Sequence, residues 1–123
     1  MANRRGVLGI YSIGNIKVRV RLLGNWRGAA VYASAPPEIS VGCRNEDWPF
    51  TVGLLTHEAM EFALERLGAR YEPSPDYARA TDGYVFHFDH RTLGEACAEV
   101  GIFLAEVLPD FSTAYKRAKA AKK

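Results

Sequence analysis

The chain has 123 residues, of which 48% are hydrophobic and 24% are charged, and its formal net charge is +2. These values are ordinary for a soluble globular protein, and the length predicts a single domain over residues 1–123. No apolar run approaches the ~20 residues of a membrane-spanning helix, and the apolar part of the N-terminus is short and broken by glycine, so we expect neither a membrane span nor a signal peptide.

The basic residues are concentrated at the C-terminus. A basic tail over residues 116–123 holds five of the 16 lysines and arginines, and the other 11 are outnumbered by 14 acidic residues. Such a tail is typical of a solvated helix end, where cations suit the helix dipole, or of a contact with nucleic acid or an acidic partner. We expect the first, and no nucleic-acid partner, because Tyr115 is the tail's one neighbouring aromatic residue.

The first forty residues predict strands. Residues 6–13 are apolar and rich in β-forming types, and residues 15–24 alternate strictly, with valines on one side and Lys17, Arg19 and Arg21 on the other. This alternation predicts an antiparallel strand with one wet face. Residues 28–34 predict a third strand and residues 38–42 a short fourth, separated by two prolines.

The second half predicts helices. Apolar residues at helical spacing indicate a first helix over about 51–67, with Thr51 as N-cap and Gly68 as its stop. A proline-containing loop over 71–83 and a strand within 83–90 follow. Thr92 and Glu95 form a capping-box pattern for a second helix over about 92–108, ended by Pro109, before a short C-terminal helix. The fold class expected is α+β, a small, mostly antiparallel sheet packed against these helices.

The first predicted helix contains the sequence HExxE at residues 57–61. In HExxH two histidines one helical turn apart bind zinc, and the glutamate between them is the general base. A carboxylate can replace an imidazole as ligand. His57 and Glu61 are therefore candidate metal ligands with Glu58 as candidate base, or the three residues form a charged helix face that resembles a metal site by chance.

A third ligand has to come from elsewhere in the chain. The other two histidines, His87 and His90, lie in the sequence HFDH. His90, at the predicted start of a helix, is the better candidate, because a residue there can turn toward a neighbouring helix. Asp89 is expected either to orient a histidine or to cap the helix.

The cysteines predict a reducing compartment. Cys43 and Cys97 are far apart in the sequence and form no disulfide framework, which favours the cytoplasm. Cys97 falls in a helical pattern, where we expect it to be buried. Neither has a second cysteine at zinc-ligand spacing.

Two segments carry a family resemblance. EISV followed by LLTHEAMEFAL resembles the edge strand and active-site helix of zincin-like proteins, and YVFHFDHRTLGEACAEVGIFLAEVLPDF resembles the later part of small bacteriophage-encoded zincin-like proteins with an HExxE variant. The resemblance implies zinc held by His57, Glu61 and His90, Glu58 as general base, and a host-cell cytoplasmic location. Glu61 departs from the standard protease motif, which puts peptidase activity in doubt more than metal binding.

Three functions remain open at this point. The first is a zinc-dependent hydrolase or a degenerate metal-binding relative, with Tyr71 or Tyr77 available to stabilise an oxyanion. The second is a non-catalytic phage protein that binds and inhibits a host protein or defence complex, through exposed aromatic and basic residues. The third, nucleic-acid binding, is favoured by Lys17, Arg19 and Arg21 on one strand face, but that strand carries no aromatic residue on the same face for bases to stack on.

Overall fold

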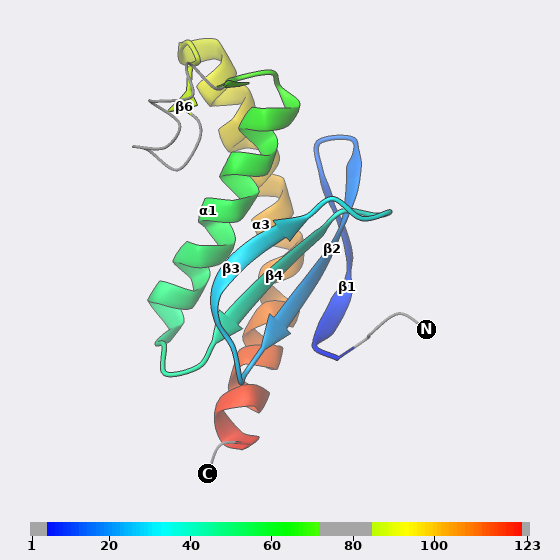
Figure 1. Ribbon diagram of the computed structural model, residues 1–123, viewed down its shortest axis with the longest axis vertical. Coiled ribbons are helices and arrows are strands. Elements are labelled where there is room, and N and C mark those ends of the chain that lie inside the picture. The colour runs from blue at the N-terminus through cyan, green and yellow to red at the C-terminus, as the bar shows by residue number, and fades with distance from the viewer. Residues whose placement is uncertain (1–4, 72–84, 122–123) are drawn as a thin grey trace.

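The computed structural model describes residues 5–71 and 85–121. The described elements, in chain order, are β1 (Val7–Ile13), β2 (Ile16–Leu23), β3 (Arg27–Tyr32), β4 (Glu38–Cys43), α1 (Trp48–Arg66), β5 (Arg70–Tyr71), β6 (Val85–Phe86) and α3 (His90–Ala121). A four-stranded sheet fills the N-terminal half and two long helices pack against it (Figure 1), so the expected α+β class is confirmed. Within the described residues, no helix is both long and apolar enough to cross a membrane.

The strand order of the sheet is β1-β2-β4-β3. β1 and β2 pair antiparallel, as do β3 and β4, whereas β2 and β4 pair parallel. The sheet is therefore mixed, although most of its pairings are antiparallel as predicted. The strand predicted to resemble a zincin edge strand, β4, instead lies inside the sheet with all six residues buried, and β3 is at the edge.

The core lies between one face of the sheet and the helices. The valines of β2 are buried and its basic residues point to the other face, which confirms the predicted alternation. α3 packs on β1 and β2, and α1 packs on β3 and β4. The largest fully buried side chains come from both layers: Phe103, Phe111, Ile13, Ile39 and Leu55.

α1 begins and ends at well-formed caps. Asp47, not the predicted Thr51, is the N-cap, because its side chain accepts a hydrogen bond from the Phe50 backbone N–H at 2.9 Å. Thr51 is buried one turn later. At the other end Gly68 has φ +79° and donates to the Glu65 carbonyl, while Ala69 donates to the Leu64 carbonyl. This pair of bonds is a Schellman motif, so the predicted stop is confirmed.

α3 is one continuous helix of 32 residues, and the expectation that Pro109 ends it is wrong. Proline removes one backbone hydrogen bond, but buried Phe103 and Val107 before it and Phe111 after it belong to the same core, and this packing outweighs the loss. The helix also begins two residues before Thr92. Its N-cap is Asp89, whose side chain accepts from the Thr92 N–H at 2.8 Å, and this confirms one of the two roles expected for Asp89.

Cys97 lies on the exposed side of α3, contrary to expectation, because the neighbouring Ala96 occupies the position that faces the core. The predicted strand within 83–90 is seen only as β6, which pairs with β5 next to the end of α1. Most of the predicted loop over 71–83, with Tyr77, lies outside the described residues, as do the last two residues of the tail.

Candidate metal site on α1

His57, Glu58 and Glu61 lie in the middle of α1. One face of α1 packs into the core. Four of its buried residues recur every four positions along this face: Thr51, Leu55, Ala59 and Ala63. His57, Glu58 and Glu61 occupy other positions of the same turns, outside this row of buried residues, where His57 is exposed and the two glutamates are half-buried. The helix alone brings the three functional groups together, as the sequence predicted.

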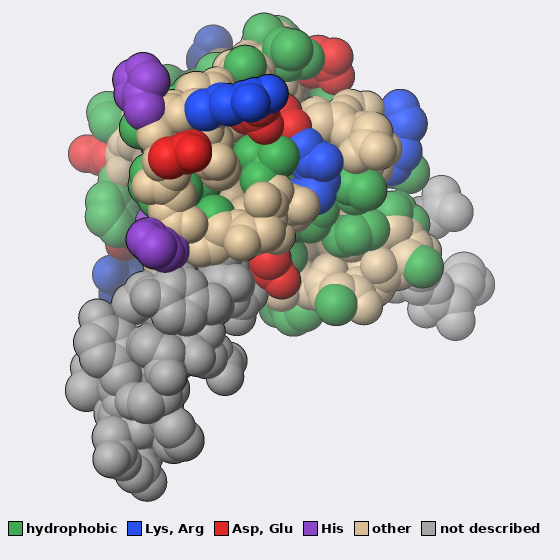
Figure 2. Space-filling model, turned by 90° about the horizontal axis from the view of Figure 1, so that it is seen from above, with side chains coloured by type: hydrophobic (Ala, Val, Ile, Leu, Met, Phe, Trp, Pro, Cys, Tyr) green, Lys and Arg blue, Asp and Glu red, His purple; other side chains and the backbone are tan. Residues whose placement is uncertain are grey.

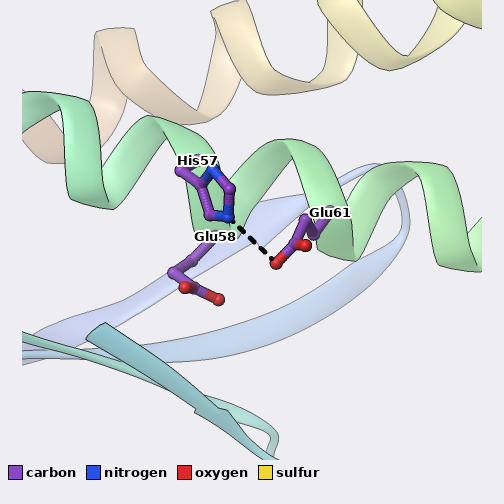
Figure 3. Close-up of side chains that lie close together, drawn as sticks. All are labelled: His57, Glu58 and Glu61. Atoms are coloured by element: carbon purple, nitrogen blue, oxygen red, sulfur yellow. Dashed lines mark ion pairs between the residues drawn. The ribbon is translucent and has the colours of Figure 1, made fainter. Parts of the chain in front are cut away.

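The three side chains converge. The His57 Nε2 and Glu61 Oε2 atoms are 3.4 Å apart, and one nitrogen or oxygen from each of the three residues lies within 4.8 Å of the other two. Figure 3 shows the His57 ring turned toward the Glu61 carboxylate, with the Glu58 carboxylate on the same side of the helix. The His57 side chain is 64% exposed and that of Glu61 is 25% exposed. The group is thus open to solvent and to a ligand.

A shallow hollow of about 540 Å³ adjoins this group. Its walls come from the first half of α1 and from β3, and include Phe50, Leu54, His57, Glu58 and Ala29. Phe50 is 53% exposed, so the hollow has an apolar side next to its charged end. This hollow could not be predicted from the sequence, because Ala29 lies next to α1 only through the position of β3 at the edge of the sheet.

The pKa of Glu58 is raised above the usual value for a glutamate. Partial burial is the main cause, the negative charge of Glu61 adds to it, and His57 partly opposes it. Two carboxylates held this close repel each other when both are ionised, and a bound cation would remove that repulsion. The group could therefore hold a positive ion.

His90, the expected third ligand, does not join the group in this structure. α1 and α3 run antiparallel, and Arg66 near the end of α1 forms an ion pair with Glu99 of α3. From that pair, His57 lies about two and a half turns in one direction along α1, and His90 lies about two and a half turns in the opposite direction along α3. The two histidines are therefore at different levels of the molecule.

His87 and His90 are exposed at the end of the molecule where α3 begins. Figure 2 looks onto this end of the molecule, where histidine side chains are visible at the surface. The Asp89 carboxylate is used by the α3 N-terminus. Of the sequence-predicted candidates, the structure brings together His57, Glu58 and Glu61 and leaves His90 outside.

The donor set of one imidazole and two carboxylates could hold a metal ion. Two ligand atoms of a tetrahedral zinc ion, each ~2.0–2.1 Å from the metal, lie roughly 3.3 Å apart, which matches the observed distance between His57 and Glu61. A third protein ligand then has to be Glu58, because among the described residues no other histidine, cysteine or carboxylate completes the group. Sequence reasoning had assigned Glu58 as the base, and the HE dipeptide alone could not distinguish the two roles.

No protein-family model, no curated protein and no solved structure matches this chain. The zincin-like resemblance of the two segments therefore stays a prediction.

Proposed function

We propose that this protein is a metal-binding relative of zincin-like proteins, in which His57, Glu58 and Glu61 together hold one zinc ion. The observation that carries the proposal is the convergence of these three side chains, with a His57–Glu61 separation of 3.4 Å that suits two ligands of one ion. Because all three residues lie within two turns of one well-capped helix, the arrangement needs no rearrangement of the fold.

Zinc suits this donor set better than calcium or magnesium. Imidazole nitrogen is a good zinc ligand, whereas calcium and magnesium favour sites made entirely of oxygen. Three protein ligands leave a coordination position open to solvent. The exposure of His57 places that position at the surface, beside the hollow between α1 and β3.

The same geometry argues against efficient peptide hydrolysis. A zincin peptidase needs three protein ligands and a separate general base, which is four groups, and among the described residues three converge. Zinc bound in such a site polarises a water or a carbonyl oxygen, but two carboxylate ligands neutralise its charge and weaken that effect. We therefore propose zinc binding with the peptidase chemistry lost.

Zinc titration of metal-free protein by isothermal calorimetry tests the proposal. We expect one zinc ion per chain, and at least a tenfold loss of affinity in His57→Ala, in Glu61→Gln and in Glu58→Gln. Glu58→Gln is decisive, because a base that does not touch the metal could be removed with little effect on affinity. The matched controls are His90→Ala and Glu95→Gln, which alter an exposed histidine and an exposed glutamate elsewhere and should bind like the wild type.

Two outcomes contradict the proposal. One is wild-type protein that takes up no stoichiometric zinc. The other is an equal loss of affinity in His90→Ala, which would restore that residue as a ligand. Cleavage of an unstructured peptide substrate that depends on zinc and disappears in Glu58→Gln would contradict the loss of peptidase chemistry, without affecting the metal assignment.

A further inference from the structure

A second, larger hollow lies on the other side of the sheet from the metal group. Its volume is about 660 Å³, and its charged walls are made by Arg5, Arg19, Arg21 and Glu38. Alternation along β2 and β4 directs these positions away from the helices, so this is the open face of the sheet. With three arginines and one glutamate, the charged lining is net positive.

The register of the sheet aligns the side chains of this hollow across three strands. Arg19 of β2 is paired with Glu38 of β4, which is paired with Tyr32 of β3, so these three form one row. In the next row Arg21 is paired with Ser40. The hollow is thus built from strands that the sequence alone could not place side by side.

Glu38 holds the arginines in place. Its residue is 9% exposed, and its carboxylate accepts a hydrogen bond from the Ser40 hydroxyl at 2.7 Å. The Arg21 guanidinium lies 3.4 Å from this carboxylate and that of Arg19 lies 3.8 Å from it. Arginines oriented in advance lose less conformational freedom when an anionic ligand binds.

Two aromatic residues complete the hollow. Tyr32, from the edge strand, is 49% exposed, and Trp26, which precedes the same strand, also lines the hollow. The absence of a stacking aromatic on β2 was the argument against nucleic acid, and β3 supplies what β2 lacks. Arginines beside exposed aromatic rings match the two parts of a nucleotide, since the phosphate needs the cations and the base needs a flat π face.

We propose that the open face of the sheet binds single-stranded nucleic acid, with Arg19 at a phosphate and Tyr32 and Trp26 stacking on bases. An acidic peptide would use the arginines but offers no flat ring for Tyr32. A duplex keeps its bases stacked inside and cannot present them to the aromatic residues. The binding does not depend on the metal group, which lies on the helix side of the sheet.

Fluorescence anisotropy with a labelled single-stranded DNA and RNA of about 12 nucleotides, at about 50 mM and about 200 mM salt, tests this inference. We expect Tyr32→Ala to weaken binding between roughly fivefold and a hundredfold, and Tyr32→Phe to retain it. Arg19→Ala should weaken binding and reduce the salt dependence by about one phosphate contact, a change of roughly 0.7 in the logarithmic slope.

The matched controls are Arg27→Ala and Phe50→Ala. Each removes an exposed arginine or aromatic residue that does not line the hollow, so each should bind like the wild type. Equal losses in these controls would overturn the inference, because binding would then be a property of the general surface or of the basic tail. Tighter binding to the matching duplex or to an oligoglutamate peptide would overturn it as well, as would no binding at the lower salt concentration.

Discussion

Asp89 shows how one side chain fixes the start of α3. Its carboxylate accepts the Thr92 backbone N–H, and this hydrogen bond is the main reason that its pKa is lowered, with a smaller contribution from the Thr92 side chain. A carboxyl group whose pKa is lower in the folded state stabilises the fold above its unfolded pKa of about 3.9, and the stabilisation is lost as the pH falls through the folded pKa.

We therefore expect Asp89→Ala to lower the melting temperature by a few degrees at about pH 7 and to have little effect at about pH 2. Asp89→Asn should keep most of the stability at neutral pH, because asparagine also caps helices, but it should remove this part of the acid dependence. Circular dichroism melting curves across this range measure both effects. A loss in Asp89→Ala that is equally large at both pH values would contradict the assignment.

For individual residues, the sequence predicted only the part of the candidate site that lies within one helix. His57 and Glu61 are brought together by the helical repeat itself, so their spacing was sufficient. The position of His90 depends on how α3 packs against α1, and the use of Asp89 rather than Thr92 as cap moved the helix start by two residues. The distance between His57 and His90 cannot be predicted from the pattern of residues within either segment.

Glycine has opposite effects on stability after the end of α1 and within α3. Gly68 follows α1 with φ +79°, a conformation that costs other residues about 1–2 kcal/mol. Gly101 lies on the exposed side of α3, where an added Cβ meets nothing within 4 Å. Glycine inside a helix costs about 0.5–1 kcal/mol relative to alanine.

The same substitution should therefore change stability in opposite directions. We expect Gly68→Ala to lower the free energy of unfolding by about 1 kcal/mol and Gly101→Ala to raise it by about 0.5–1 kcal/mol, both measured by urea unfolding. Destabilisation by Gly101→Ala would mean that the outer face of α3 is packed against something in solution.

Helices and strands were predicted well where a pattern within the segment itself determines them. The alternation of β2 and the stop of α1 at Gly68 are local signals, and both are confirmed. The central place of β4 and the passage of α3 through Pro109 depend on contacts with other elements. For α3 these contacts include Lys119, which donates to the Cys43 carbonyl at 2.7 Å, and they hold the helix beyond the proline.

Tyr11 connects the two layers of the whole molecule. Its hydroxyl, on β1, donates to the Asp110 carboxylate of α3 at 2.6 Å, and its ring meets Phe103 edge to face. Burial raises the pKa of Tyr11 well above its usual value, and the hydrogen bond and the charge of Asp110 raise it further. The stabilisation is complete below the unfolded pKa of about 10 and is lost as the pH rises above it.

Tyr11→Phe keeps the ring and removes the hydrogen bond. We expect a loss of about 1–2 kcal/mol at neutral pH and a flatter decline of stability above about pH 10 than in the wild type. Urea unfolding at several alkaline pH values measures this, with Tyr32→Phe as the control for an exposed tyrosine. An unchanged alkaline decline in Tyr11→Phe would show that the hydroxyl is not protected as described.

β3 separates the two hollows described above, which lie on opposite sides of the sheet. Its alternate residues face opposite sides of the sheet, with Ala29 at the hollow beside the candidate metal group and Tyr32 at the basic hollow of the open face. Among the described strands only β4 holds it by backbone hydrogen bonds. A ligand on either side should therefore shift the backbone amide resonances of these six residues. One isotope-labelled sample can be titrated first with zinc and then with an oligonucleotide. The resonances would show whether binding at one hollow affects the other hollow through β3.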